Sequence, residues 1–182
     1  MTLYALKPKF QALLRPQVER LAARGVTANQ VTLLAALVSV LVGALVAGFH
    51  RTPVIFLLLP VWLFARMALN AVDGMLAREF GQQSRLGGYL NELCDIVSDA
   101  ALVLPFVLLP AFGSSWVLLV VFLAILGEYA GVMGPLVGAS RRYDGPLGKS
   151  DRALVFGALG FWVGLGLPLG GWAGWLMPLI AL

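Results

Sequence analysis

Amide and carboxylate side chains recur at helical spacing in one part of the chain. Asn70 and Asp73 lie three residues apart, and Asn91 and Asp95 lie four residues apart. Residues at these spacings are neighbours on a helix surface, so each pair would occupy one face of its helix. Carboxylate and amide oxygens gathered in this way suit Mg²⁺, Mn²⁺ and Ca²⁺. The pattern predicts that two adjacent antiparallel helices hold a divalent cation between them.

Small and cationic residues stand next to these oxygens. Gly74, Ala77 and Gly87 are small enough for a ligand or a second helix to approach the backbone closely. Arg78 offers a planar guanidinium fork that suits phosphate. Ionisable groups inside a membrane bundle are costly and usually mark a functional site. We interpret the segment as such a site.

The chain that must position these residues is strongly apolar. Of its 182 residues, 60% are hydrophobic and 12% are charged, whereas soluble domains average about 25% charged residues. This composition excludes an ordinary soluble domain and indicates a membrane protein. The single cysteine, Cys94, excludes an internal disulfide.

The apolar runs predict an all-α integral membrane protein with a single domain over residues 1–182. Residues 8–24 carry apolar side chains on one side and cations largely off it, which predicts an amphipathic helix on the membrane surface. Residues 27–182 are expected to form a bundle of six transmembrane helices, the last of them short or truncated. The spans are expected near residues 31–48, 54–79, 84–112, 115–138, 149–168 and 172–182.

The Lys and Arg residues predict the orientation of these spans. They collect before the first span, between the second and third, and between the fourth and fifth, while the opposite side has only Arg51. Cytoplasmic loops are enriched in Lys and Arg. We therefore expect both termini, and the site described above, at the cytoplasmic face.

The motif residues resemble a longer signature, D-x-x-D-G-x-x-A-R-x8-G-x3-D-x3-D, of the CDP-alcohol phosphatidyltransferase family. The residues that match, with the eight-residue spacer intact, are Asp73, Gly74, Ala77, Arg78, Gly87 and Asp95. Asn70 and Asn91 stand where the family has its first and third aspartates. The spacing is long and specific. The amphipathic first helix, the six spans and the segment GKSDRA at 148–153 are also similar to the family's organisation.

The resemblance implies a reaction in phospholipid biosynthesis. An alcohol attacks the β-phosphorus of a CDP-linked lipid such as CDP-diacylglycerol, and CMP leaves. The acceptor alcohol stays open. The expected partners are membrane lipids and a second copy of the chain in a homodimer, and no nucleic acid. The expected location is the bacterial inner (cytoplasmic) membrane, which the chain would cross several times.

The resemblance also assigns roles to the motif residues. The ligands of a bound Mg²⁺ or Mn²⁺ would be Asp73, Asn70, Asn91 and Asp95. The CDP moiety would be held by Asp73, Gly74, Ala77, Arg78 and Gly87. Asp95 would be the catalytic base that accepts the proton of the acceptor hydroxyl, or else a metal ligand only. The two amides remove two negative charges, so one ion is expected and a second stays open.

A cationic cluster near the start of the fifth span predicts an acceptor that carries a phosphate or another anion. Its members are Arg141, Arg142, Lys149 and Arg152. Lys149 and Arg152 are three residues apart on a helix and could clamp an anion together. Ordinary cytoplasmic loop charge and contact with lipid headgroups explain Arg141 and Arg142 equally well.

Arg66 lies far from the ends of its span. At 1.5 Å per residue, Asp99 and Glu128 come out at a similar depth. We expect Arg66 to pair with one or both of them, in an architectural rather than catalytic role.

Two other functions compete with catalysis. The two amides are compatible with a catalytically impaired family member that acts as a CDP-lipid-binding or partner subunit. The buried charges Arg66, Asp99 and Glu128 are compatible with an ion or proton carrier. The acids cluster at one side of the predicted membrane instead of forming a relay across it, which favours the enzyme.

Overall fold

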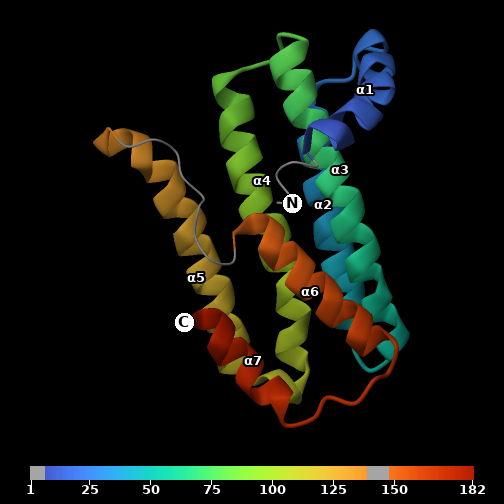
Figure 1. The fold of residues 1–182 in the computed structure, drawn as a ribbon, viewed down its shortest axis with the longest axis vertical. Coiled ribbons are helices and arrows are strands. Elements are labelled where there is room, and N and C mark those ends of the chain that lie inside the picture. The colour runs from blue at the N-terminus through green and yellow to red at the C-terminus, as the bar shows by residue number, and fades with distance from the viewer. Residues whose placement is uncertain (1–6, 139–147) are drawn as a thin grey trace. The chain divides into compact units, whose positions relative to one another are not determined.

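The computed structural model describes residues 7–138 and 148–182, and every regular element in them is a helix (Figure 1). The α-helices are α1 Lys7–Ala23, α2 Ala28–Gly48, α3 Leu58–Glu79, α4 Arg85–Val103, α5 Ser114–Met133, α6 Lys149–Gly164 and α7 Trp172–Ala181. Short 3-10 helices are η2 Pro53–Leu57, η3 Leu104–Leu108, η4 Pro110–Phe112 and η5 Gly134–Val137. The all-α prediction is confirmed for the described residues.

In the part of the chain that the structure describes, three helical segments are long and apolar enough to cross a membrane: Ala28–Gly48, Pro53–Glu79 and Ser114–Val137. They correspond to the first, second and fourth predicted spans, and the protein is a membrane protein on this ground. α7 is apolar but shorter. α4 is less apolar because it carries the acids of the motif. The full set of six spans and the interfacial position of α1 stay predictions.

The chain forms two compact units, whose boundaries fall within α2, α3 and α4. The first unit comprises Met1–Val38 and Phe64–Asp95, and the second comprises Ser39–Leu63 and Ile96–Leu182. All the motif residues from Asn70 to Asp95 belong to the first unit.

The core of the first unit joins α1 to parts of α2 and α3. Val18 of α1 is fully buried and packs in one cluster with Val31 of α2 and with Val72, Met75 and Leu76 of α3. These apolar side chains leave water together, at roughly 25 cal/mol per Å² of buried area. The cluster packs the motif helix α3 against the α1–α2 corner.

The corner between α1 and α2 is closed by local hydrogen bonds. Gly25 has φ +75°, and the amides of Gly25 and Val26 donate to the carbonyls of Ala22 and Leu21. This is the Schellman arrangement that ends a helix at a glycine. Thr27 and Gln30 then form a capping box: the Thr27 amide donates to Gln30 Oε1 at 2.9 Å, and the Gln30 amide donates to Thr27 Oγ1 at 3.3 Å.

Gln82, in the loop between α3 and α4, binds the same corner. Its Oε1 accepts from the Ala28 amide at 2.7 Å, and its Nε2 donates to the Val26 carbonyl at 3.2 Å. Arg15 of α1 also forms a two-bond ion pair with Glu79 at the end of α3, at 2.6 and 3.3 Å. The loop that separates the two halves of the motif is thus held to the start of α2.

The second unit has an aromatic core. Phe106 contacts the rings of Phe56, Phe112 and Phe156, with centroids 5.5–5.6 Å apart in edge-on or tilted geometry. A glycine lets two backbones meet nearby: a Cβ on Gly43 would come within 2.8 Å of the Ala101 carbonyl carbon. Only a residue without a side chain fits this approach of α2 to α4.

Candidate active site

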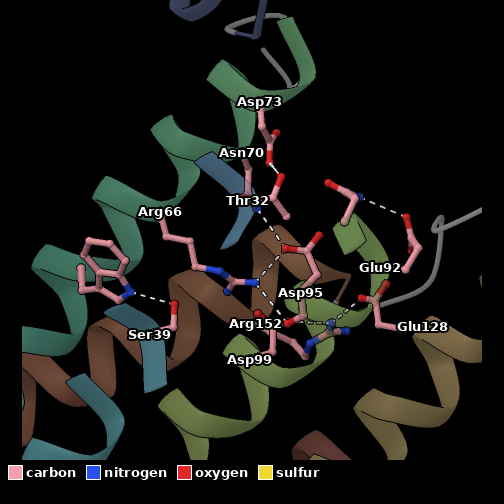
Figure 2. A network of polar contacts seen from close by, with 12 residues as sticks. Thr32, Ser39, Arg66, Asn70, Asp73, Glu92, Asp95, Asp99, Glu128 and Arg152 are labelled. Carbon is pink, nitrogen blue, oxygen red and sulfur yellow. Dashed lines mark hydrogen bonds and ion pairs between the residues drawn. The ribbon is translucent and has the colours of Figure 1, made fainter. Parts of the chain in front are cut away.

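The motif residues come from two helices of the first unit. α3 carries Asn70, Asp73, Gly74, Ala77 and Arg78, and α4 carries Gly87, Asn91 and Asp95. A direct hydrogen bond joins the two halves of the motif: Asn70 Nδ2 donates to Asp95 Oδ1 at 3.3 Å (Figure 2). The first and last positions of the signature therefore meet, as the helical spacing predicts.

Asp73 is the most buried acid of the motif, with 6% of its surface exposed. Its Oδ2 accepts a hydrogen bond from Thr32 Oγ1 of α2 at 2.7 Å, and the same hydroxyl also lies 3.1 Å from the Ala28 carbonyl (Figure 2). A buried carboxylate needs such donors to offset the loss of water. Thr32 thereby fixes the direction in which the carboxylate points.

Asp95 is held by an ion pair from α3. Arg66, which is 4% exposed, places Nη2 at 3.0 Å from Asp95 Oδ1 and 3.2 Å from the Asp95 carbonyl oxygen. One carboxylate oxygen thus accepts from both Arg66 and Asn70, which are one helical turn apart (Figure 2). Arg66 lies on the same stripe of α3 as Asn70, a spacing visible in the sequence.

The third motif position engages its neighbour. Asn91 Nδ2 donates to Glu92 Oε1 at 3.1 Å, and both side chains are half-buried.

Within residues 7–138 and 148–182, no three carboxylate, histidine or cysteine side chains lie close enough together to hold a metal ion. The oxygens present are two carboxylates, Asp73 and Asp95, and two amides. This set suits one divalent cation of the hard, oxygen-binding kind and is poor for two.

Two small residues of the motif make room for polar groups. A Cβ on Gly74 would lie 2.7 Å from Nη2 of Arg78, so the guanidinium of Arg78 covers this glycine. A Cβ on Gly87 would lie 2.8 Å from Asn29 Oδ1 and 3.0 Å from Ser84 Oγ. Arg78 is exposed and Gly87 half-buried, so both ends of this face are accessible to a charged ligand.

The predicted acceptor cations belong to the second unit or lie outside the described residues. Arg152 Nη2 donates to Asp99 Oδ2 at 3.1 Å and to Glu128 Oε1 at 2.5 Å (Figure 2). These three side chains border a pocket whose other walls are apolar, among them Ile125 and Phe156. Arg152 therefore serves an internal ion-pair network. The side chain of Lys149 and the whole of Arg141 and Arg142 lie outside what the structure describes.

The ion pairs differ in detail from the sequence expectation. Asp99 and Glu128 were expected to face Arg66, and the structure pairs both with Arg152. Arg66 engages Asp95, the residue assigned to catalysis. A pairing of Arg66 with Asp99 or Glu128 would join the two units and stays a prediction.

Two contributors to the site had weak signals in the sequence. Thr32 lies outside the matched signature, and its hydroxyl donates to Asp73 Oδ2. Gln82 had no signal, because its two backbone partners lie 54 and 56 residues away.

Comparisons with known proteins agree with the motif. The model of the CDP-alcohol phosphatidyltransferase family matches residues 25–182. The chain is 52% identical over 165 residues to the inner membrane protein YnbA of Escherichia coli (strain K12), covering 91% of this chain and 82% of that protein. It is 31% identical over 124 residues to the archaetidylinositol phosphate synthase of Pyrococcus horikoshii, covering 68% of this chain and 61% of that protein. The resemblance seen in the motif is confirmed: the chain belongs to the CDP-alcohol phosphatidyltransferase family.

Proposed function

We propose that the protein transfers a phosphatidyl, or other substituted phosphate, group from a CDP-linked lipid such as CDP-diacylglycerol to an alcohol and releases CMP. The observation that carries the proposal is the contact between the two halves of the motif, Asn70 to Asp95 at 3.3 Å, beside a buried Asp73. Family membership supports the same reaction class in phospholipid biosynthesis.

The residues of the first unit have distinct tasks in this reaction. Asp73, with Asn70, Asn91 and Asp95, would hold one Mg²⁺ or Mn²⁺, which when bound offsets the negative charge of the diphosphate. Thr32 orients Asp73 for this purpose. Arg78, lying over Gly74, would bind the diphosphate, and Gly87 and Ala77 would let the cytidine approach the helices.

The chemical step needs one proton acceptor. The acceptor's hydroxyl oxygen forms a bond to the β-phosphorus, the bond from that phosphorus to the CMP oxygen breaks, and CMP leaves with the electron pair. The hydroxyl proton passes to Asp95, which Arg66 and Asn70 hold in position through Oδ1. Positioning and charge compensation, rather than a covalent intermediate, account for catalysis here.

The acceptor is expected to be a hydrophilic alcohol, with an anion contacted by Lys149, Arg141 and Arg142. Arg152 contributes less to this contact, because Asp99 and Glu128 already compensate its charge. Inositol phosphate is one acceptor to test, in view of the name of the archaeal relative; glycerol 3-phosphate and serine are others. We further propose that the protein is a homodimer in a bacterial inner membrane, with both termini and the site at the cytoplasmic face.

The test is CMP release from CDP-diacylglycerol by the purified full chain in detergent. Each acceptor is supplied with Mg²⁺, Mn²⁺ or a chelator, and the variants are Asp73→Ala and Asp95→Asn. We expect metal-dependent CMP that one acceptor stimulates and both variants abolish. Arg15→Gln is the matched control, because its exposed pair with Glu79 lies in the same unit but outside the motif. CDP-lipid binding without CMP from any acceptor would favour a binding subunit instead.

A further inference from the structure

A buried guanidinium lies inside the predicted metal site. Arg66 is 4% exposed and contacts Asp95 twice, through Oδ1 at 3.0 Å and through the carbonyl oxygen at 3.2 Å. It belongs to the same face of α3 as Asn70 and Asp73, four and seven residues further on. A positive charge on this face competes with any cation for the same carboxylate.

The charge of the site is too small for two divalent ions. Asp73, Asp95 and Glu92, which accepts a hydrogen bond from Asn91, carry three negative charges, Arg66 carries one positive charge, and Asn70 and Asn91 add none, so the net charge is −2. Two divalent ions about 3.5–4 Å apart would bring four positive charges next to it. Carboxylates normally bridge and screen such a pair of ions. Here the amide nitrogen of Asn70 donates to Asp95 Oδ1, and only the neutral Oδ1 of Asn70 is left to bind a cation.

We propose that Arg66 takes the place of one divalent cation in this site, so that the protein works with a single bound ion. The guanidinium engages Asp95 Oδ1, and Asp73 would be the principal carboxylate ligand of the single ion. Arg66 is a positioning residue for Asp95 in this account. The inference rests on the proposed function, because it concerns the metal content of the same site.

The substitutions fit together in charge. Asn70→Asp would add one negative charge to the set, and Arg66→Gln would remove one positive charge. Both changes together make the net charge of the site more negative by two. A second divalent cation, which carries two positive charges, would compensate this difference. Asn70→Asp alone leaves Arg66 in place to pair with the new carboxylate one helical turn away.

The experiment counts Mn²⁺ ions bound to the full chain in detergent by electron paramagnetic resonance, with saturating CDP. We expect one ion per chain with an uncoupled six-line signal in the unaltered protein, in Asn70→Asp and in the control Arg15→Gln. The double variant Arg66→Gln with Asn70→Asp should bind two ions and show spin coupling. Size-exclusion chromatography checks that each variant is folded.

Three results would overturn the inference: two ions or none in the unaltered protein, two ions in Asn70→Asp alone, or a single ion in a folded double variant. The unaltered protein decides the question even if the double variant does not fold. The count needs no turnover. A chain that binds one ion but releases no CMP therefore refutes the proposed transfer and leaves the charge replacement standing.

Discussion

The hydrogen bond from Thr32 to Asp73 gives a quantitative test of how the site holds its metal. Its two atoms, Oγ1 and Oδ2, are 2.7 Å apart, and both residues are less than a tenth exposed. Thr32→Val keeps the shape of the side chain and removes only the donor. Any effect on the metal then reports the hydrogen bond, since packing against α3 is conserved.

The size of the effect follows from two independent ranges. A hydrogen bond to a charged group contributes about 1.5–3 kcal/mol. Removing a side chain that orients a metal ligand typically lowers metal affinity about 10–100-fold, which is about 1.4–2.7 kcal/mol. The ranges agree, so we expect Thr32→Val to weaken Mn²⁺ binding 10–100-fold.

The assay is a Mn²⁺ titration of the detergent-purified protein, followed by loss of the free-ion resonance signal. Thr32→Ser is the matched control: it retains the hydroxyl and should bind Mn²⁺ within about threefold of the unaltered protein, well inside the spread of single hydrogen-bond energies. Unaltered affinity in Thr32→Val would refute the assignment of Asp73 as a metal ligand. Equal losses in both variants would show that packing, not the donor, matters.

Three further changes test the packing of the two units by thermal denaturation in detergent. Gly88→Ala meets open space and should stabilise α4 by up to about 1 kcal/mol, whereas Gly87→Ala should stabilise it less, because the new Cβ would lie 2.8 Å from Asn29 Oδ1 and that side chain must move away. Arg152→Met leaves the buried Glu128 and the half-buried Asp99 without their shared cation and should cost about 3–5 kcal/mol, against at most about 1 kcal/mol for the exposed Arg15→Met. Gly43→Ala should destabilise by at least 1–3 kcal/mol, since its Cβ would meet backbone atoms that cannot rotate away. Equal melting temperatures within any of these comparisons would contradict the contact concerned.

Local signals in the sequence predicted local structure well. The capping box depends on only two residues three positions apart, Thr27 and Gln30, so its signal lies in the local sequence. The helical stripes of the motif likewise predicted that Asn70 and Asp95 face each other. Both cases depend on the period of the helix, which the spacing of residues determines directly.

The choice of ion-pair partners could not be read in the same way. Asp95 and Asp99 are one turn apart on α4, a rise of about 6 Å, so a depth estimate does not distinguish them as partners of an arginine on another helix. Arg152 was predicted to clamp an anion together with Lys149, because the two residues are three positions apart on a helix. Its side chain instead lies among Asp99 and Glu128, because packing in the second unit, not sequence distance, decides which face of α6 is buried.

The contact of Gln82 with the α1–α2 corner gives the spacer of the motif a fixed length. Gln82 binds the backbone of Val26 and Ala28 from within the eight residues that separate Arg78 from Gly87. A residue inserted after Gln82 would rotate Asp95 by about 100° about the axis of α4, unless the loop absorbed it. Substitutions in this segment are therefore tolerable where insertions and deletions are not. In a library of variants that retain function, this segment should contain substitutions but no insertions or deletions.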